Sequence, residues 1–186
     1  MQRVNLLATE TDEDLVRQVR LGDPEAERLL TLRLYPGVLS LSSRLLQDPE
    51  IARDSAQEAF LRAFTKLHQY DDRHRFSAWV FRILVNLVRD LHRRKGRVIT
   101  IELEPDDWPC HEPIPVDALI REEDARRVRA EVDRLPDSSR VALLLHFQQG
   151  LNGREVAYAL GISHVAARLK ISRAVAKLRQ RMGGGA

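Results

Sequence analysis

Basic side chains at helical spacing are the groups in this sequence best suited to chemistry with a ligand. Four polar residues are spaced four, three and four apart and so share one helix face: Arg82, Asn86, Arg89 and Arg93. Residues 73–97 contain eight Lys or Arg and a single acid, Asp90. A cationic face of this kind suits a polyanion such as a nucleic acid, although basic runs also occur on solvated surface helices.

Residues typical of enzyme active sites form no recognisable pattern. The six histidines are scattered, and we find no glycine-rich phosphate loop, nucleophile elbow or metal-spaced ligand set. Cys110 and His111 are adjacent but lack a second ligand pair, so a zinc site is not expected. We therefore expect neither an enzyme nor a bound metal or cofactor.

Composition points to a soluble protein with strongly segregated charge. The net charge is only +3, yet residues 99–124 carry nine acids and one base, whereas residues 165–182 carry six bases and no acid. The single cysteine excludes an intramolecular disulfide and fits a reducing compartment. No apolar run approaches a membrane span, and the first residues lack a signal-peptide core. We expect a cytoplasmic protein of one or two modest domains.

Two amphipathic helices flanking a polar loop, residues 70–75, should position the cationic stripe. The second helix has an apolar face made of Phe76, Val80, Ile83, Leu84, Leu87 and Leu91. The first helix is predicted to bury Ala56, Phe60, Phe64 and Leu67 and to expose Asp54, Gln57, Glu58 and Arg62. The loop contains an aromatic ring, two acids and basic groups, which could hold unstacked bases and phosphates, or could be an ordinary surface loop.

Helix-start signals occur three times before this pair. Thr11 precedes three acids, and Asp23-Pro24 and Asp48-Pro49 each place a capping acid before a proline. Gly22 should end the first helix, and Pro36 should kink or break the second.

Beyond residue 96 the composition of the chain changes. An acidic, proline-rich stretch predicts a flexible linker, followed by a helix from about residue 117 to residue 135. The next helix should be capped by Asp137 or Ser138 and end at Gly150.

A helix-turn-helix pattern closes the sequence. Gly161 permits the turn, and Ser163 can cap the last helix. That helix is predicted to pack through Ala167, Ile171, Ala174 and Leu178 and to expose a cationic stripe of Lys170, Arg173, Lys177 and Arg181. A helical hairpin with a basic tail is the alternative, but turn, cap and apolar faces together favour the helix-turn-helix.

These residues carry a family resemblance. Asp54-x-x-Gln57-Glu58-Ala59-Phe60, Phe76-x-x-Trp79 and Arg82-Ile83-x-Val85-Asn86 resemble region 2 of bacterial sigma factors, most closely the extracytoplasmic-function (group IV) members of the sigma-70 family. The C-terminal segment resembles region 4. The resemblance implies an all-α fold of two small domains, region 2 over residues 10–96 and region 4 over residues 124–182, joined by a flexible linker over residues 97–123.

The same resemblance implies a promoter-specificity subunit of RNA polymerase that assists melting of the −10 element. Core polymerase would be bound by Asp54, Gln57 and Glu58. The −10 element would be bound by Tyr70, Asp71, Arg73, His74, Arg75, Arg82, Asn86 and Arg89. The −35 element would be bound by Ser163, His164, Arg168, Lys170, Arg173 and Lys177. An anti-sigma factor is the expected regulatory partner.

Two departures from the family pattern affect the second DNA-binding segment. Ala166-Ala167-Arg168-Leu169-Lys170-Ile171 replaces the usual Thr-Val-Lys-Ser-Arg-Leu, and Asn152-Gly153-Arg154 replaces Ser-Tyr-Glu. Both bear on the −35 preference and leave the fold prediction unchanged. A stand-alone helix-turn-helix regulator is the alternative function, although it leaves the residues from Asp54 to Arg94 without a role.

Overall fold

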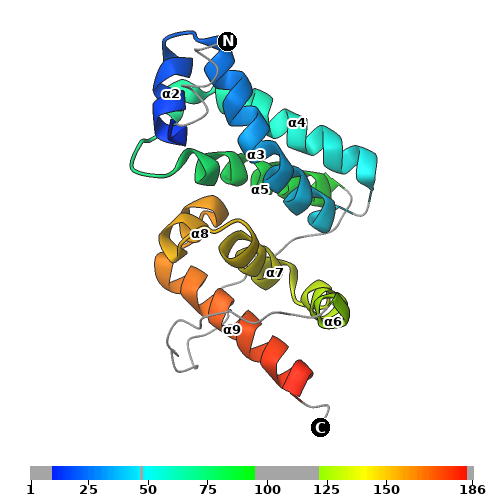
Figure 1. Cartoon of the computed structure of the whole chain (residues 1–186). Helices are drawn as coiled ribbons and strands as arrows, with labels where there is room; N and C mark the ends of the chain where they lie inside the picture. Colours follow the sequence, from blue (N-terminus) through cyan, green and yellow to red (C-terminus); the bar gives the residue numbers. More distant parts are fainter. Residues whose placement is uncertain (1–9, 47, 95–121, 184–186) are drawn as a thin grey trace. The chain divides into compact units, whose positions relative to one another are not determined.

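The described residues fold into helices alone. The computed structural model describes residues 10–46, 48–94 and 122–183, and none of these residues forms a strand (Figure 1). The predicted all-α class is therefore confirmed for this part of the chain. The predicted linker up to residue 121, with Cys110 and His111, lies outside the described residues.

The helices group into two compact units. The first contains α2 (Asp12–Arg20), α3 (Pro24–Leu45), α4 (Pro49–Thr65), the short 3-10 turn η1 (Leu67–Gln69) and α5 (Phe76–Arg94). The second contains α6 (Glu122–Asp133), α7 (Asp137–Leu143), the π-helical turn η2 (Leu144–Gln148), most of α8 (Gly153–Leu160) and α9 (His164–Gly183). The predicted boundary at residue 124 falls just inside α6.

The predicted caps of the first unit are confirmed. Thr11 accepts a hydrogen bond from the Asp14 amide, and the Asp14 carboxylate bonds back to Thr11 in a capping box. Asp23 and Asp48 cap α3 and α4, each followed by proline at the first helical position. Gly22, which follows the C-cap residue Leu21, takes a positive φ of 84°, a conformation that glycine adopts without strain.

The core of the first unit runs along α5. Phe76, Val80 and Leu84 are fully buried, as predicted. Val88 is also buried, whereas three other residues of the predicted apolar face are only partly buried: Ile83, Leu87 and Leu91. The buried side chains of α4 facing this core are mostly small: Ala52, Ala56, Ala59 and Ala63, with Phe60. Such small residues allow the two helices to approach closely.

Pro36 does not break its helix. α3 is continuous from residue 24 to residue 45, so of the predicted kink or break the structure excludes the break. A proline at this position removes the hydrogen bond to the carbonyl of Leu32. Both Pro36 and Leu32 lie on the exposed side of α3, where water can bond that carbonyl.

The second unit begins its α7 helix without the predicted cap. Pro136 occupies the N-cap position, and no side chain caps the helix. Asp137 instead pairs with Arg140, while Ser138 is buried. The predicted end at Gly150 is confirmed, since this glycine takes a φ of 67° after η2. No described helix is long and apolar enough to cross a membrane.

Candidate nucleic-acid interface

The polar face of α4 is formed as predicted. Asp54 and Gln57 are exposed and Glu58 is partly exposed, while Ala56 and Ala59 on the opposite face are buried. The Glu58 carboxylate accepts a hydrogen bond of 2.6 Å from Nε of Arg62, one turn later. The result is a solvent-facing row of acid and amide groups on a helix fixed by its small buried residues.

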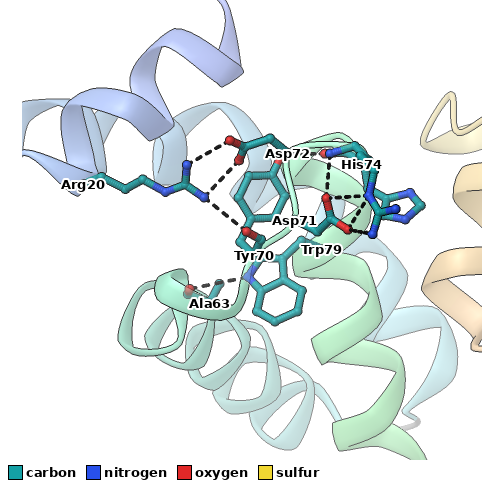
Figure 2. Close-up of polar contacts among 8 residues, drawn as sticks. Arg20, Ala63, Tyr70, Asp71, Asp72, His74 and Trp79 are labelled. Atoms are coloured by element: carbon teal, nitrogen blue, oxygen red, sulfur yellow. Dashed lines mark hydrogen bonds and ion pairs between the residues drawn. The ribbon is translucent and has the colours of Figure 1, made fainter.

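Tyr70, predicted to offer an aromatic face to bases, is instead an internal residue. Only 6% of Tyr70 is exposed, and its ring lies edge-on to Phe76 with centroids 5.5 Å apart. Its hydroxyl donates to the His74 carbonyl at 2.5 Å, which fixes the far side of the loop (Figure 2). Burial, and the negative charges of Glu13 and Asp72, raise the pKa of Tyr70. Its ring supports the loop from inside.

Trp79 packs beneath this loop, beside Tyr70. Its indole N–H points to the carbonyl of Ala63, 3.5 Å away, so α5 is tied to α4 below the loop (Figure 2). The centroids of the Trp79 and Tyr70 rings are 6.2 Å apart, and Trp79 is 9% exposed. Within the loop, His74 is the remaining ring and is partly exposed.

The first acid of the loop holds the chain in a turn. Asp71 accepts hydrogen bonds from the Arg73 amide at 3.0 Å and from the Arg73 guanidinium at 2.5–3.0 Å. The Asp71 carbonyl accepts from the His74 amide at 3.1 Å. The side-chain and backbone bonds from Arg73 lower the pKa of Asp71 to about 2. Arg73 and Arg75 remain exposed, as a phosphate-binding role requires.

The second acid of the loop is held by α2. Arg20, the last residue of α2, bonds the Asp72 carboxylate at 2.9 Å and the Tyr70 carbonyl at 3.1 Å (Figure 2). Sequence reasoning missed this residue. Its only local signal is a basic residue in a last helical turn, which usually indicates a dipole interaction.

The cationic stripe of α5 is present on the structure. Asn86 is exposed, and Arg82 and Arg89 are partly exposed. The Arg89 guanidinium donates to the Asn86 amide oxygen at 3.1 Å, and Arg93 pairs with Asp90 at 3.0 Å. Asn86 and Arg89 of the stripe therefore orient one another, while Arg93 is held by an acid of the same helix.

The helix-turn-helix of the second unit has two well-formed helix starts. Asn152 caps α8 by accepting from the Arg154 and Glu155 amides, and the Glu155 carboxylate accepts from the Asn152 amide at 2.8 Å. Gly161 takes a φ of 68°, and Ser163 caps α9 through the Ala166 amide at 3.1 Å. The predicted turn and cap are confirmed, and the departure at Asn152 preserves the capping function.

Lys170 does not belong to the exposed cationic stripe of α9. It is 8% exposed, and its ammonium donates to the Ser138 hydroxyl of α7 at 3.1 Å. The reason is helical geometry, because residue 170 follows Ala167 by three and precedes Ala174 by four, and both alanines are fully buried. Arg168 and Lys177 are exposed and Arg173 is partly exposed. The predicted exposure of Lys170 on the cationic stripe is therefore wrong.

Gly153 allows a close approach between the starts of α8 and α9. A Cβ atom at this position would lie 3.1 Å from Nε2 of His164 and 3.6 Å from Cγ of Arg168. Glycine in the Asn152-Gly153-Arg154 segment therefore leaves room for two residues of the predicted recognition helix, His164 and Arg168.

Comparison with known proteins agrees with this arrangement. The family model of sigma-70 region 2 matches residues 30–98, and that of sigma-70 region 4 matches residues 125–178. The RNA polymerase sigma-H factor of Pseudomonas aeruginosa is 30% identical over 178 residues, which cover 91% of this chain and 92% of that protein. The chain belongs to the sigma-70 family of RNA polymerase sigma factors. As a sigma factor it directs transcription initiation, and its partners are core polymerase and promoter DNA.

Other relatives place this sigma factor in the extracytoplasmic-function group. The extracytoplasmic-function (ECF) RNA polymerase sigma-E factor of Escherichia coli K12 is 31% identical over 173 residues, covering 88% of this chain and 90% of that protein. The solved structure of CnrH in complex with the cytosolic domain of CnrY matches 95% of this chain and 100% of that one, with 26% identity and a TM-score of 0.68. The predicted resemblance is confirmed, and a stand-alone regulator does not account for the region 2 match.

No group of three or more potential metal ligands occurs among the residues that the structure describes.

Proposed function

We propose that this sigma factor divides its work between a region 2 domain, residues 10–96, and a region 4 domain, residues 124–182. The observation that carries the proposal is that one unit holds both an exposed acid-and-amide face on α4 and a cationic face on α5. Two different faces on one domain suit two different partners, a basic protein surface and a nucleic acid. We further infer that the protein is a non-enzymatic factor that works in the cytoplasm.

The α4 face is the proposed docking surface for core polymerase. Asp54, Gln57 and Glu58 project together and are accessible. Carboxylates and amides at this spacing complement a basic helical hairpin, and such charge complementarity chiefly sets orientation and association rate. The Arg62 bond to Glu58 restricts one of these acids before binding.

Charge reversal at this surface tests the docking assignment. Asp54→Lys with Glu58→Lys should weaken binding to core polymerase by at least about tenfold, because two attractive contacts become repulsive. The helical fold should persist, since surface changes shift stability by roughly half a kcal/mol. Affinity is measured by titration of labelled sigma factor with purified core polymerase.

The matched control reverses the same number of charges elsewhere on the first unit. Glu13 and Glu27 are exposed acids at the starts of α2 and α3, so Glu13→Lys with Glu27→Lys changes net charge equally on helices other than α4. Normal polymerase binding by the Asp54/Glu58 variant, or equal loss in both variants, would show that the docking surface lies elsewhere.

The loop and the α5 stripe form the proposed −10 site. Arg73, Arg75 and His74 supply charge and a ring at the loop, while Arg82, Asn86 and Arg89 continue the polar surface along α5. Tyr70 acts beneath the loop, and Asp71 shapes its turn. Because the melted strand presents both bases and phosphates, a mixed polar and cationic surface is suited to hold it.

The start and exposed side of α9 form the proposed −35 site. His164 and Arg168 lie in the first turns of the helix, where recognition helices contact base edges. Arg173 and Lys177 follow as phosphate contacts, and Ser163 contributes by capping the helix.

An anti-sigma factor is the proposed regulator, as is usual in the extracytoplasmic-function group. Large apolar side chains are exposed on both units, Leu61 at 63% and Val165 at 61% among them. A regulatory protein that covered such side chains would compete with the polymerase or with promoter DNA.

A further inference from the structure

Arg20 makes an unusual set of contacts for a residue at the end of a helix. One guanidinium nitrogen bonds Oδ2 of Asp72 at 2.9 Å, and the other lies 2.9 Å from Oδ1 of the same carboxylate. The second nitrogen also donates to the Tyr70 carbonyl at 3.1 Å. The guanidinium carbon is 5.6 Å from the centre of the Tyr70 ring. One side chain thus contacts a carboxylate, a carbonyl and a ring of the loop (Figure 2).

The helix that carries Arg20 is itself well anchored. Its N-terminus is closed by the Thr11–Asp14 capping box, and Leu15 and Val16 are buried at 0% and 1% exposure. Arg33 of α3 donates to the Glu10 carbonyl at 2.6 Å and to the Asp12 carboxylate at 3.2 Å. Arg20 therefore reaches the loop from a fixed support fifty residues earlier in the sequence.

Hydrogen bonds within the loop of residues 70–75 hold its backbone, and Arg20 adds a contact from α2. The Tyr70 hydroxyl bonds the His74 carbonyl, and Asp71 bonds Arg73, so each of these contacts lies within the loop. Asp72 lies between them and is bonded to α2. Because the Arg20 and Asp72 side chains are 36% and 67% exposed, their pair contributes little to global stability. Its effect is on loop geometry and local charge.

We propose that Arg20 is a positioning residue for capture of the melted promoter strand. It holds the loop of residues 70–75 at a fixed place relative to α5. It also neutralises the Asp72 carboxylate, which lies in the same loop as the basic side chains proposed to bind phosphates, Arg73 and Arg75. Without it, strand binding has to order the loop and overcome the charge of Asp72. This inference rests on the proposed −10 site and extends it to α2, a helix that makes no contact with DNA in that proposal.

The test measures strand capture by the complete holoenzyme. Wild-type sigma factor with core polymerase first selects sequences from single-stranded DNA with a randomised centre. Affinity for the selected strand is then measured for Arg20→Ala, which should bind about three- to tenfold more weakly because loop order and charge compensation are both lost. Arg20→Lys keeps the charge but not the forked contact, and should recover part of the loss.

Further variants separate charge from geometry. In an Asp72→Asn background, Arg20→Ala should cost less affinity than in wild type, because no uncompensated acid remains. Arg17→Ala is the matched control, since Arg17 lies on the same helix and pairs with Asp14 of that helix. It should leave strand affinity unchanged. The affinity for core polymerase and the midpoint of thermal unfolding should match those of the wild type in all these variants.

Hydrogen exchange in the free sigma factor supplies an independent readout. The His74 amide, which donates to the Asp71 carbonyl, should exchange faster in Arg20→Ala but not in Arg17→Ala. Wild-type affinity and wild-type His74 exchange in Arg20→Ala would overturn the proposal. Failure of the wild-type holoenzyme to select any sequence would overturn the −10 assignment itself, and normal selection with an unaffected Arg20→Ala would overturn only the role of Arg20.

Discussion

The two lysines of α9 show how burial separates side chains of one type. Lys170 is bonded to Ser138 beneath the helix, whereas Lys177, seven residues later, is exposed. An ammonium group held inside a domain cannot release counterions from DNA, so its contribution is to packing between α7 and α9. Arg168 and Lys177 thus carry the charge that the sequence pattern also attributed to Lys170.

A pair of methionine substitutions tests this distinction. Lys177→Met should lower the slope of log affinity against log salt by about one unit, because one phosphate contact is lost. Lys170→Met should leave that slope unchanged and reduce the free energy of unfolding by about 1 kcal/mol, since Ser138 loses its buried donor. Binding of the full chain to a duplex −35 element at several salt concentrations, with chemical denaturation, provides both measurements. Equal slope changes would return Lys170 to the DNA-binding surface.

The turn between α8 and α9 needs a glycine because of its backbone conformation, and not because a side chain would lack room there. Gly161 has a φ of 68°, and a Cβ atom added to it would have no neighbouring atom within 4 Å. Gly153 is the opposite case, because its φ is outside the left-handed region but an added Cβ atom would lie 3.1 Å from the His164 side chain. The two glycines are therefore needed for different physical reasons.

Substitutions at Gly161 should follow the cost of the left-handed conformation. Gly161→Ala should destabilise the second unit by about 1 kcal/mol, and Gly161→Asn by less, because asparagine tolerates positive φ better than alanine. Thermal or urea unfolding of the full chain, followed by a probe in the second unit, measures both. An asparagine variant that cost as much as the alanine variant, or more, would contradict the role of the left-handed conformation at this turn.

Local signals explain which elements could be predicted from the sequence. The caps at Thr11, Asp23 and Asp48 and the turn at Gly161 depend on residues within four positions, so the sequence was sufficient to identify them. The exposed face of α4 followed from helical period alone. The helix is not broken at Pro36 because the carbonyl that loses its hydrogen bond lies on the exposed side of α3. Which side of this helix is exposed depends on tertiary packing, so the sequence could not show it.

The errors at the site share a different cause. Tyr70 and Lys170 are polar residues in polar segments, and the sequence pattern therefore placed them on the surface. Tyr70 is buried by the rings of Phe76 and Trp79 on the helix that follows the loop, and no periodic pattern links the loop to that helix. The burial of Lys170 depends on Ser138, 32 residues earlier in the chain. Arg20 was missed for the same reason, since its partners lie fifty and fifty-two residues away. Long-range pairing of this kind leaves no periodic signal in the sequence.

At the level of the whole molecule, function requires both domains to act on one promoter. In the proposed assignment, region 4 binds duplex DNA without any strand separation, whereas the loop and the α5 stripe bind only where bases are unpaired. The two activities can therefore be separated by mutation. Residues of the α5 stripe should affect promoter opening and leave duplex binding at the −35 element unaffected.

Permanganate footprinting of promoter thymines provides the test of this separation. Arg82→Ala, Asn86→Ala and Arg89→Ala combined should strongly reduce strand opening with core polymerase, because the cations and amide proposed to hold the melted strand are lost. Binding of the same variant to a duplex −35 element should equal that of wild type. A pre-melted bubble should partly restore activity if the variant is defective in opening, and less so if strand capture itself is lost.

The control for this variant removes the same positive charge from other helices. Arg17→Ala with Arg28→Ala deletes two exposed arginines, each paired to an acid three residues earlier in its own helix. It should open promoters normally, because neither arginine lies on the loop or on α5. If the triple-alanine variant opens promoters as well as wild type, these three residues are not part of the −10 site. If both variants fail to the same degree, net charge alone accounts for the defect, and the position of the stripe on α5 is not what matters for holding the strand.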